Sequence, residues 1–179
     1  MTTSPGDAEP PTGTRRTRAE RARVRIPAAA LREPVHLLAL GFGAGLAPFA
    51  PGTFGSIVGL VLALILLQAG WWVAFAATVL VCIAGVWICG ASARRLGVHD
   101  HPAIVWDEIA GMMLVMLAAP ATWWGAALGF ALFRLFDVWK PWPIREVDHG
   151  LPGGAGIMLD DILAAVWAAA ILLLTRKYT

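Results

Sequence analysis

The chain has 179 residues, of which 58% are hydrophobic and 15% are charged, and its formal net charge is +2. An ordinary soluble domain carries about a quarter charged residues, so this composition indicates a membrane protein with the length of one domain. The part of the chain after residue 33 has seven basic and eight acidic residues, and this lack of a basic excess argues against a nucleic-acid-binding protein.

The basic excess lies in the N-terminal segment 1–33, which contains seven arginines and four acidic residues. The segment is also rich in proline and threonine. We therefore expect residues 1–33 to form a disordered cytoplasmic tail that biases membrane topology and contacts anionic lipid. Residues 34–179 are expected to form one membrane-embedded domain.

The first half of this domain is almost free of charge, because no Asp, Glu, Lys or Arg occurs in 34–93. The stretch APFAPGTFGS at 47–56 interrupts it with two prolines and two glycines, so the region cannot form one helix. We expect a short apolar or re-entrant helix at 35–46 and a second helix at 57–68. A third helix, at 71–91, has the length of about 20 residues that crosses a bilayer.

The second half of the domain predicts further helices at about 103–118, 122–138 and 157–175, with a Pro- and Gly-rich loop at 140–156. No stretch alternates between apolar and polar residues as a half-buried strand does. The sequence therefore predicts an all-α fold. We expect a polytopic membrane helical bundle with about four to five apolar helices plus a short re-entrant or interfacial helix.

The order of the helices predicts where their polar ends meet. Arg94 and Arg95 follow the helix expected at 71–91, and the positive-inside rule places them on the cytoplasmic side. The helices that follow alternate in direction, so the ends that carry polar residues return to this side. We therefore expect a site at the cytoplasmic helix ends.

Three acidic groups lie at these ends, in WDE (106–108), FRLFD (133–137) and MLDD (158–161). The helix dipole stabilises a carboxylate at a helix start, which would explain one acidic residue per helix. Five carboxylates on one side of the bundle repel one another unless a cation lies between them, and Mg²⁺ prefers oxygen ligands. The pattern predicts a magnesium centre whose metal-ligand and catalytic candidates are Asp107, Glu108, Asp137, Asp160 and Asp161.

Basic side chains accompany the acidic pattern and are candidates for phosphate binding. Arg134 lies one helical turn before Asp137, Lys140 follows the helix end, and Arg145 lies in the next loop. Beside carboxylates and magnesium, such cations stabilise the charge of phosphate oxygens. The simpler interpretation is an ion pair, a lysine that reaches the membrane surface and a solvated loop arginine.

Two short motifs add further candidates. In PGTFGS (51–56), Thr53 is a candidate phosphate-binding residue, because N–H groups at the start of the next helix attract anions; a plain helix cap by Thr53 or Ser56 is the alternative. In GVHDHP, His99 or His101 could transfer a proton to the leaving group. The alternative for these histidines is a polar turn at the membrane surface.

Four blocks carry a resemblance to a known family: HLLALGFGAGLAPFAPGTFGS, GVHDHPAIVWDEIAGM, FRLFDVWKPWPI and GGAGIMLDD. In this order they closely resemble bacterial phosphatidylglycerophosphatase A, over about residues 34–170. The resemblance implies a magnesium-dependent phosphatase of the inner membrane. Such an enzyme converts phosphatidylglycerophosphate to phosphatidylglycerol and inorganic phosphate. The matching blocks place the five carboxylates at the acidic centre, with Arg134, Lys140 and Arg145 nearby. One departure is Pro152, which stands where the family commonly has a histidine.

Three other functions compete with this interpretation. A phospholipid head-group transferase of the CDP-alcohol type would use a similar acidic site, but its D-G-x2-A-R motif is absent from the sequence. A non-enzymatic ion-binding or transport protein would place its carboxylates along a path through the bilayer. Cys89 and Arg95 have the C-x5-R spacing of cysteine-dependent phosphatases, but the histidine that precedes that cysteine is missing.

Overall fold

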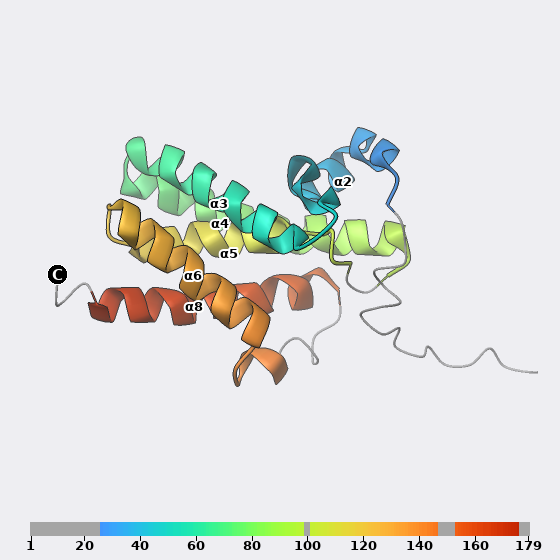
Figure 1. Cartoon of the computed structure of the whole chain (residues 1–179). Helices are drawn as coiled ribbons and strands as arrows, with labels where there is room; N and C mark the ends of the chain where they lie inside the picture. Colours follow the sequence, from blue (N-terminus) through green and yellow to red (C-terminus); the bar gives the residue numbers. More distant parts are fainter. Residues whose placement is uncertain (1–25, 99–100, 147–152, 176–179) are drawn as a thin grey trace, which may run out of the picture.

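The computed structural model describes residues 26–98, 101–146 and 153–175, and every regular element within these ranges is a helix (Figure 1). This confirms the predicted all-α fold. The elements in chain order are η1 (Ala28–Arg32), α2 (Pro34–Ala39), η2 (Gly41–Leu46), α3 (Pro51–Gln68), α4 (Trp71–Leu96), α5 (Trp106–Ala118), α6 (Trp123–Trp139) and α8 (Gly154–Thr175). Of the expected disordered tail, 1–33, residues 1–25 lie outside the described residues, whereas its last part contains η1 and is therefore not disordered as expected.

Three of these helices are long and apolar enough to cross a membrane: α3 with 18 residues, α4 with 26 and α8 with 22. Their outward side chains are largely apolar, as Leu80 and Ile83 of α4 illustrate. The two other apolar helices, α5 with 13 residues and α6 with 17, are shorter. The described part of the chain is therefore a bundle of five apolar helices, three of which have spanning length.

The central helix of the bundle is α5, which packs against α3, α4, α6 and α8 (Figure 1). Its side chains Ile109 and Met112 are buried in the core. The backbone of α3 approaches α5 so closely that a Cβ added to Gly59 would lie 2.6 Å from the Ile109 carbonyl oxygen. Small residues permit such close approach between membrane helices. The surrounding helices thus fix α5, whose first turn carries Asp107 and Glu108.

The expectation of one helix at 35–46 is wrong. Here α2 ends at Ala39, and η2 follows after a kink in which Phe42 has a φ of 58° and Gly43 a φ of 102°. Residues in the left-handed region cannot continue a right-handed helix. The segment therefore forms two short pieces that turn back on the bundle.

The start of α3 also differs from the expectation, because the helix begins at Pro51 and not at residue 57. Proline suits the first helical position, where its missing N–H would have no helical partner. Gly55 packs against Val105, the residue that precedes α5, and a Cβ at Gly55 would lie 2.7 Å from Cβ of Val105. The two glycines that predicted an open loop are in fact needed for close packing inside a helix.

The other helix boundaries differ from the expected ones by less than two helical turns. Helix α4 continues to Leu96, so that Arg94 and Arg95 form its last turn, and Gly97 ends it with a φ of 64°. Helix α5 begins at Trp106, three residues later than expected, and α8 begins at Gly154, three residues earlier. These shifts leave the order and number of the long helices as predicted.

The segment that leads into α5 is held by the N-terminal pieces. The amide of Val105 donates a hydrogen bond of 2.8 Å to the carbonyl of Ala39. Gly45 of η2 lies against Ala103, where an added Cβ would be 1.9 Å from the Ala103 carbonyl oxygen. The position of α2 and η2 therefore determines where α5 begins, and with it the position of the first-turn carboxylates.

The variant Gly45→Ala is expected to be destabilised by about 1–3 kcal/mol, because its methyl group overpacks a contact with backbone. The apparent melting temperature in detergent should fall accordingly. Gly97→Ala is the control, since its Cβ meets nothing within 4 Å and adds only the strain of a positive φ. A wild-type melting temperature for Gly45→Ala would contradict this account of the η2 contact.

Candidate active site

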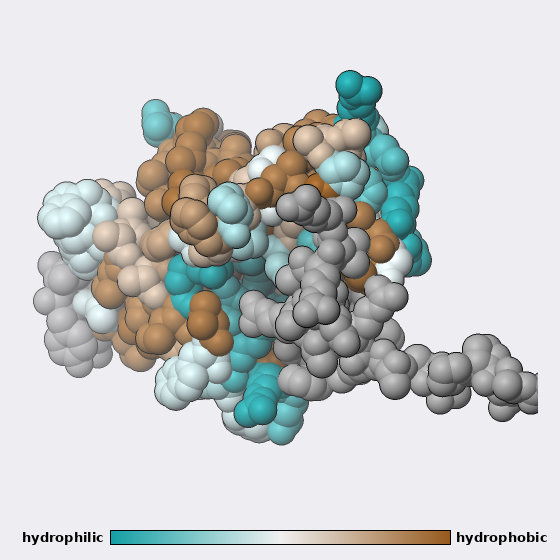
Figure 2. Space-filling model, turned by 45° about the vertical axis from the view of Figure 1, so that its right-hand side comes forward, coloured by the Kyte–Doolittle hydropathy of each residue, from teal (hydrophilic) through white to brown (hydrophobic). Residues whose placement is uncertain are grey.

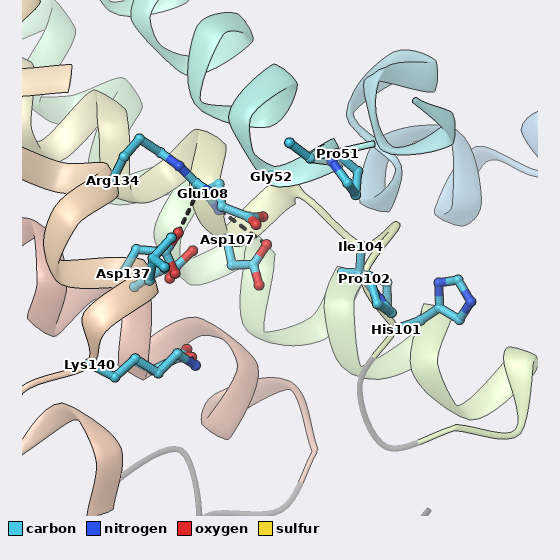
Figure 3. A pocket seen from close by; sticks show the side chains of 14 residues that line it. Pro51, Gly52, His101, Pro102, Ile104, Asp107, Glu108, Arg134, Asp137 and Lys140 are labelled. Carbon is cyan, nitrogen blue, oxygen red and sulfur yellow. Dashed lines mark hydrogen bonds and ion pairs between the residues drawn. The ribbon is translucent and has the colours of Figure 1, made fainter. Parts of the chain in front are cut away.

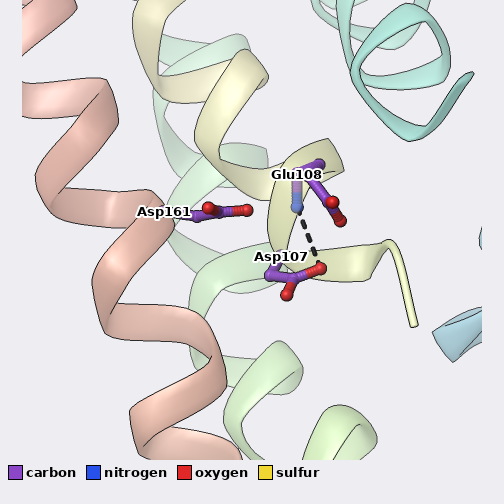
Figure 4. A group of neighbouring side chains, drawn as sticks. All are labelled: Asp107, Glu108 and Asp161. Carbon is purple, nitrogen blue, oxygen red and sulfur yellow. Dashed lines mark hydrogen bonds between the residues drawn. The ribbon is translucent and has the colours of Figure 1, made fainter. Parts of the chain in front are cut away.

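Three carboxylates meet where α5 begins and α8 passes it. Asp107 and Glu108 come from the first turn of α5, and Asp161 reaches toward them from α8 (Figure 4). One oxygen of each residue lies within 4.8 Å of the others, a spacing that can hold a metal ion. Asp161 is only 3% exposed and Asp107 8%. Residues separated by more than 50 positions in the sequence thus form one buried acidic group.

The hydrogen-bonding capacity of the carboxylates in this group is only partly satisfied by the described residues. Among the described residues, Glu108 Oε2 and Asp161 Oδ2 are buried without a hydrogen-bond partner. Asp107 Oδ1 accepts one hydrogen bond, of 3.1 Å, from the amide of Glu108. Unpaired buried charge is costly, so these oxygens indicate a missing positive partner. The donor set, three carboxylates with free lone pairs, fits a hard metal ion.

Burial changes the pKa values of the two carboxyl groups on α5, a helix that is not one of the three with spanning length. Desolvation, followed by the charges of Glu108 and Asp161, raises the pKa of Asp107 well above its usual range. Desolvation also raises the pKa of Glu108 to about 7, although the nearby Arg134 acts in the opposite direction. Both pKa values are raised because the anionic forms of these two carboxyl groups are disfavoured when no cation lies beside them.

The acidic group forms part of the wall of a cavity of about 160 Å³ between the start of α3, the start of α5, the end of α6 and α8 (Figure 3). Eight of the residues proposed from the sequence line it: Asp107, Glu108, Asp137, Asp160, Asp161, His101, Arg134 and Lys140. For the five carboxylates and Lys140, this is the convergence that the helix order predicted. Thr53 and Arg145 are not among the described residues that line the cavity, and their roles stay predictions.

The two cations of the cavity both come from the end of α6 (Figure 3). Arg134 forms an ion pair with Asp137, one turn away, and its Nη1 lies 3.5 Å from the hydroxyl oxygen of Ser56 on α3. Lys140 ends α6 in the left-handed conformation, and its Nζ lies 2.5 Å from Asp160 Oδ2. The cavity thus contains positive charge beside the carboxylate group, which is what a phosphate ligand requires.

His101 lines the cavity on the side away from α6 (Figure 3). The residue is 6% exposed, and its Nδ1 accepts a hydrogen bond of 3.1 Å from the amide of Ala103. His99 and Pro152 lie outside the described residues. The predicted proton transfer by His101 is therefore not tested by these contacts, although the ring is correctly located at the cavity.

The start of α3 contributes differently from the expectation. The helix is preceded by Ala50, which makes no side-chain cap, and the hydroxyl of Ser56 donates to the carbonyl of Gly52 within the helix. The segment is therefore the first turn of α3 and not a loop before a helix at 57, and no side-chain cap by Thr53 or Ser56 is formed; anion binding by Thr53 stays a prediction. Gly52 instead lines the cavity, and a Cβ there would lie 2.2 Å from Glu108 Oε1. The sequence signal for this contact is Gly52 itself, because glycine occurs both in loops and where a backbone approaches a neighbour closely.

The competing cysteine site is not formed. Cys89 is completely buried in α4, and its thiol contacts the sulfur of Met158 at 3.9 Å. Arg95, which the C-x5-R spacing would bring to a phosphate beside the thiol, instead forms an ion pair of 2.9 Å with Glu33. A nucleophilic thiolate needs an accessible and electropositive environment, which Cys89 lacks.

The fold and the site together define a class: a helical protein with helices of membrane-spanning length and a buried carboxylate group beside two basic side chains. The family model described as Phosphatidylglycerophosphatase A matches residues 37–176, and the chain belongs to this family. Family membership favours hydrolysis over the transferase and transport alternatives.

Two curated relatives show the extent of the similarity. The chain is 45% identical to Phosphatidylglycerophosphatase A of Escherichia coli over 143 residues, which are 79% of this chain and 83% of the relative. It is 46% identical to Phosphatidylglycerophosphatase A of Haemophilus influenzae over 144 residues, covering 79% of this chain and 88% of the relative. No solved structure matches the chain.

The contact between Gly52 and Glu108 gives a sharp test of the site. Gly52→Ala places a methyl group on the Glu108 carboxylate, so we expect phosphatase activity to fall about 100-fold while the protein stays folded. The control is Gly129→Ala in α6, whose Cβ would lie 3.2 Å from Cγ1 of Val115, an apolar side chain that does not line the cavity. Phosphate release and melting temperature should be measured together. Wild-type activity in Gly52→Ala would contradict the position assigned to Glu108.

Proposed function

We propose that this protein hydrolyses phosphatidylglycerophosphate at the cavity between α3, α5, α6 and α8, with Mg²⁺ held by the buried carboxylates. By family membership the chain is a phosphatidylglycerophosphate phosphatase, a phosphoric monoester hydrolase of phosphatidylglycerol biosynthesis. The metal, the residue roles and the membrane orientation are the parts that we propose here.

The observation that carries the proposal is the buried group of Asp107, Glu108 and Asp161, two of whose carboxylate oxygens have no hydrogen-bond partner within the described part of the chain. Magnesium typically binds through one or two carboxylates together with substrate phosphate. Bound there, Mg²⁺ supplies the positive charge that stabilises phosphate oxygens during transfer. We assign these three residues as its protein ligands.

The two other carboxylates of the predicted set have a different role in this proposal. Asp137 and Asp160 are paired with Arg134 and Lys140, respectively, and these pairs hold both cations at the cavity. The cations bind the phosphate and stabilise the charge that develops on its oxygens. Their pairing with carboxylates keeps the long side chains oriented when no substrate is present.

His101 is the proposed proton donor to the departing glycerol oxygen, because it is the described histidine that lines the cavity. An imidazole ring has two nitrogens that can donate or accept a proton, as general acid catalysis requires. Arg145 and Thr53 stay candidates for contacts with the rest of the head group, since neither lines the cavity in the described structure.

We place the site on the cytoplasmic side of a bacterial inner membrane. The starts of α3, α5 and α8 and the ends of α4 and α6 lie toward the same end of the bundle (Figure 1). Arg94 and Arg95 occupy the last turn of α4 at this end, and basic residues favour the cytoplasmic side. The lipid substrate would keep its acyl chains in the bilayer while its phosphate enters the cavity.

The proposal is tested with purified protein in detergent micelles that contain phosphatidylglycerophosphate. Phosphate release should require Mg²⁺, and Asp161→Asn should lower it about 100- to 1000-fold, since losing a ligand removes several kcal/mol of charge stabilisation. Calorimetric titration with Mg²⁺ provides a second readout, in which Asp161→Asn should bind the ion more weakly.

Glu146→Gln is the matched control, because Glu146 is an exposed carboxylate that does not line the cavity. It should retain wild-type activity and Mg²⁺ affinity. The proposed metal site would be refuted if Asp161→Asn bound Mg²⁺ and released phosphate as the wild type does. Detection of phosphatidylglycerol and inorganic phosphate as the products distinguishes hydrolysis from head-group transfer.

A further inference from the structure

The catalytic cavity meets the apolar surface of the bundle at the end of α6. Val138 lines the cavity and is nevertheless 72% exposed. At the start of α3, the exposed Ala50 lines the cavity, and the exposed Phe49 precedes it. Exposed apolar residues therefore border the cavity both at the start of α3 and at the end of α6, the elements that carry Pro51 and Asp137 in Figure 3.

Charged and apolar side chains lie on different sides of the end of α6. Arg134 and Asp137 face the cavity, whereas Leu135, Val138 and Trp139 form an exposed apolar strip, which we call the α6 strip. The strip residues lie at positions i, i+3 and i+4, on one side of a helix. Figure 2 shows hydrophilic residues gathered within a largely hydrophobic surface. The last turns of α6 therefore carry charged side chains on the side of the cavity and exposed apolar side chains on the neighbouring side.

This arrangement matches the chemistry of a phospholipid with a terminal phosphate. We propose that the α6 strip and Phe49 hold the acyl chains of the substrate, so that the lipid reaches the cavity laterally between α3 and α6. The inference rests on the proposed function, because it takes the cavity as the place where the phosphate binds. Continuity between the cavity and the strip through Val138 is the observation that selects lipid as the occupant.

Other exposed apolar surfaces of the bundle do not have this continuity. Helix α4 presents Leu80, Ile83 and Trp87, each more than 60% exposed, yet no described residue of α4 lines the cavity. We therefore treat the α4 surface as general contact with the bilayer. It also provides control positions with the same residue character and similar exposure.

The test compares two substrates: phosphatidylglycerophosphate with long acyl chains in mixed micelles, and its water-soluble analogue with four-carbon chains. In Val138→Asn and Trp139→Gln, kcat/KM for the long-chain lipid should fall about tenfold relative to the short-chain analogue, because apolar contacts with the chains are lost. The matched controls Ile83→Asn and Trp87→Gln should leave this ratio unchanged.

Each result has a defined meaning. Equal losses on both substrates, or equal effects in the α4 controls, would overturn the role of the α6 strip, as would an unchanged ratio in all variants. The proposed function fails separately if the wild type releases no phosphate from either substrate with Mg²⁺ present.

A second measurement uses only wild-type protein and is independent of variant folding. A phosphatidylglycerophosphate with a photoactivatable acyl chain should label the peptide containing residues 135–139 more than a phosphatidylcholine with the same chain does. Labelling of residues 80–87 should be equal for the two probes. The same ratio of labelling at both helices would contradict lateral access at α6.

Discussion

Three carboxylate groups lie within 4.8 Å of one another in the interior of an apolar bundle, and their mutual repulsion is the constraint on which the site depends. Burial removes the water that would otherwise solvate them, and the raised pKa of Glu108 reflects this cost. Two further carboxylates at the cavity are balanced by Arg134 and Lys140. No ion pair to the central three is found among the described residues, and their spacing could hold a metal ion.

Such a group can persist only if the helices that carry it are held firmly. Helix α3 supplies this support through Gly52, Gly55 and Gly59, which face Glu108, Val105 and Ile109 of the α5 region, respectively. Each position lacks room for a Cβ, so the α3 backbone itself forms the surface against which α5 rests. Because lipid is as apolar as a hydrophobic core, membrane helices depend on this close backbone packing more than soluble helices do.

The position of the cavity relates the chemistry to the membrane. The carboxylates line a cavity between the starts of α3 and α5 and the end of α6, while exposed side chains of α6 and α4 such as Val138 and Ile83 are apolar. A lipid phosphatase has to bring a charged head group to charged residues without removing the acyl chains from the bilayer. A site at one end of a bundle of spanning helices fulfils both conditions.

The sequence by itself determined the helical class, the order of the apolar helices and the convergence of Asp107, Asp137 and Asp161, because hydropathy and the alternating direction of successive helices are properties of the chain. It did not determine the start of α3 or the kink at Phe42. Glycine and proline have the same local signal in a loop and in a tightly packed helix, so 51–56 read as a loop. Only the tertiary structure decided that Gly52 must make room for Glu108, and which carboxylates are paired with a cation. Both depend on distances between helices that no local sequence pattern encodes.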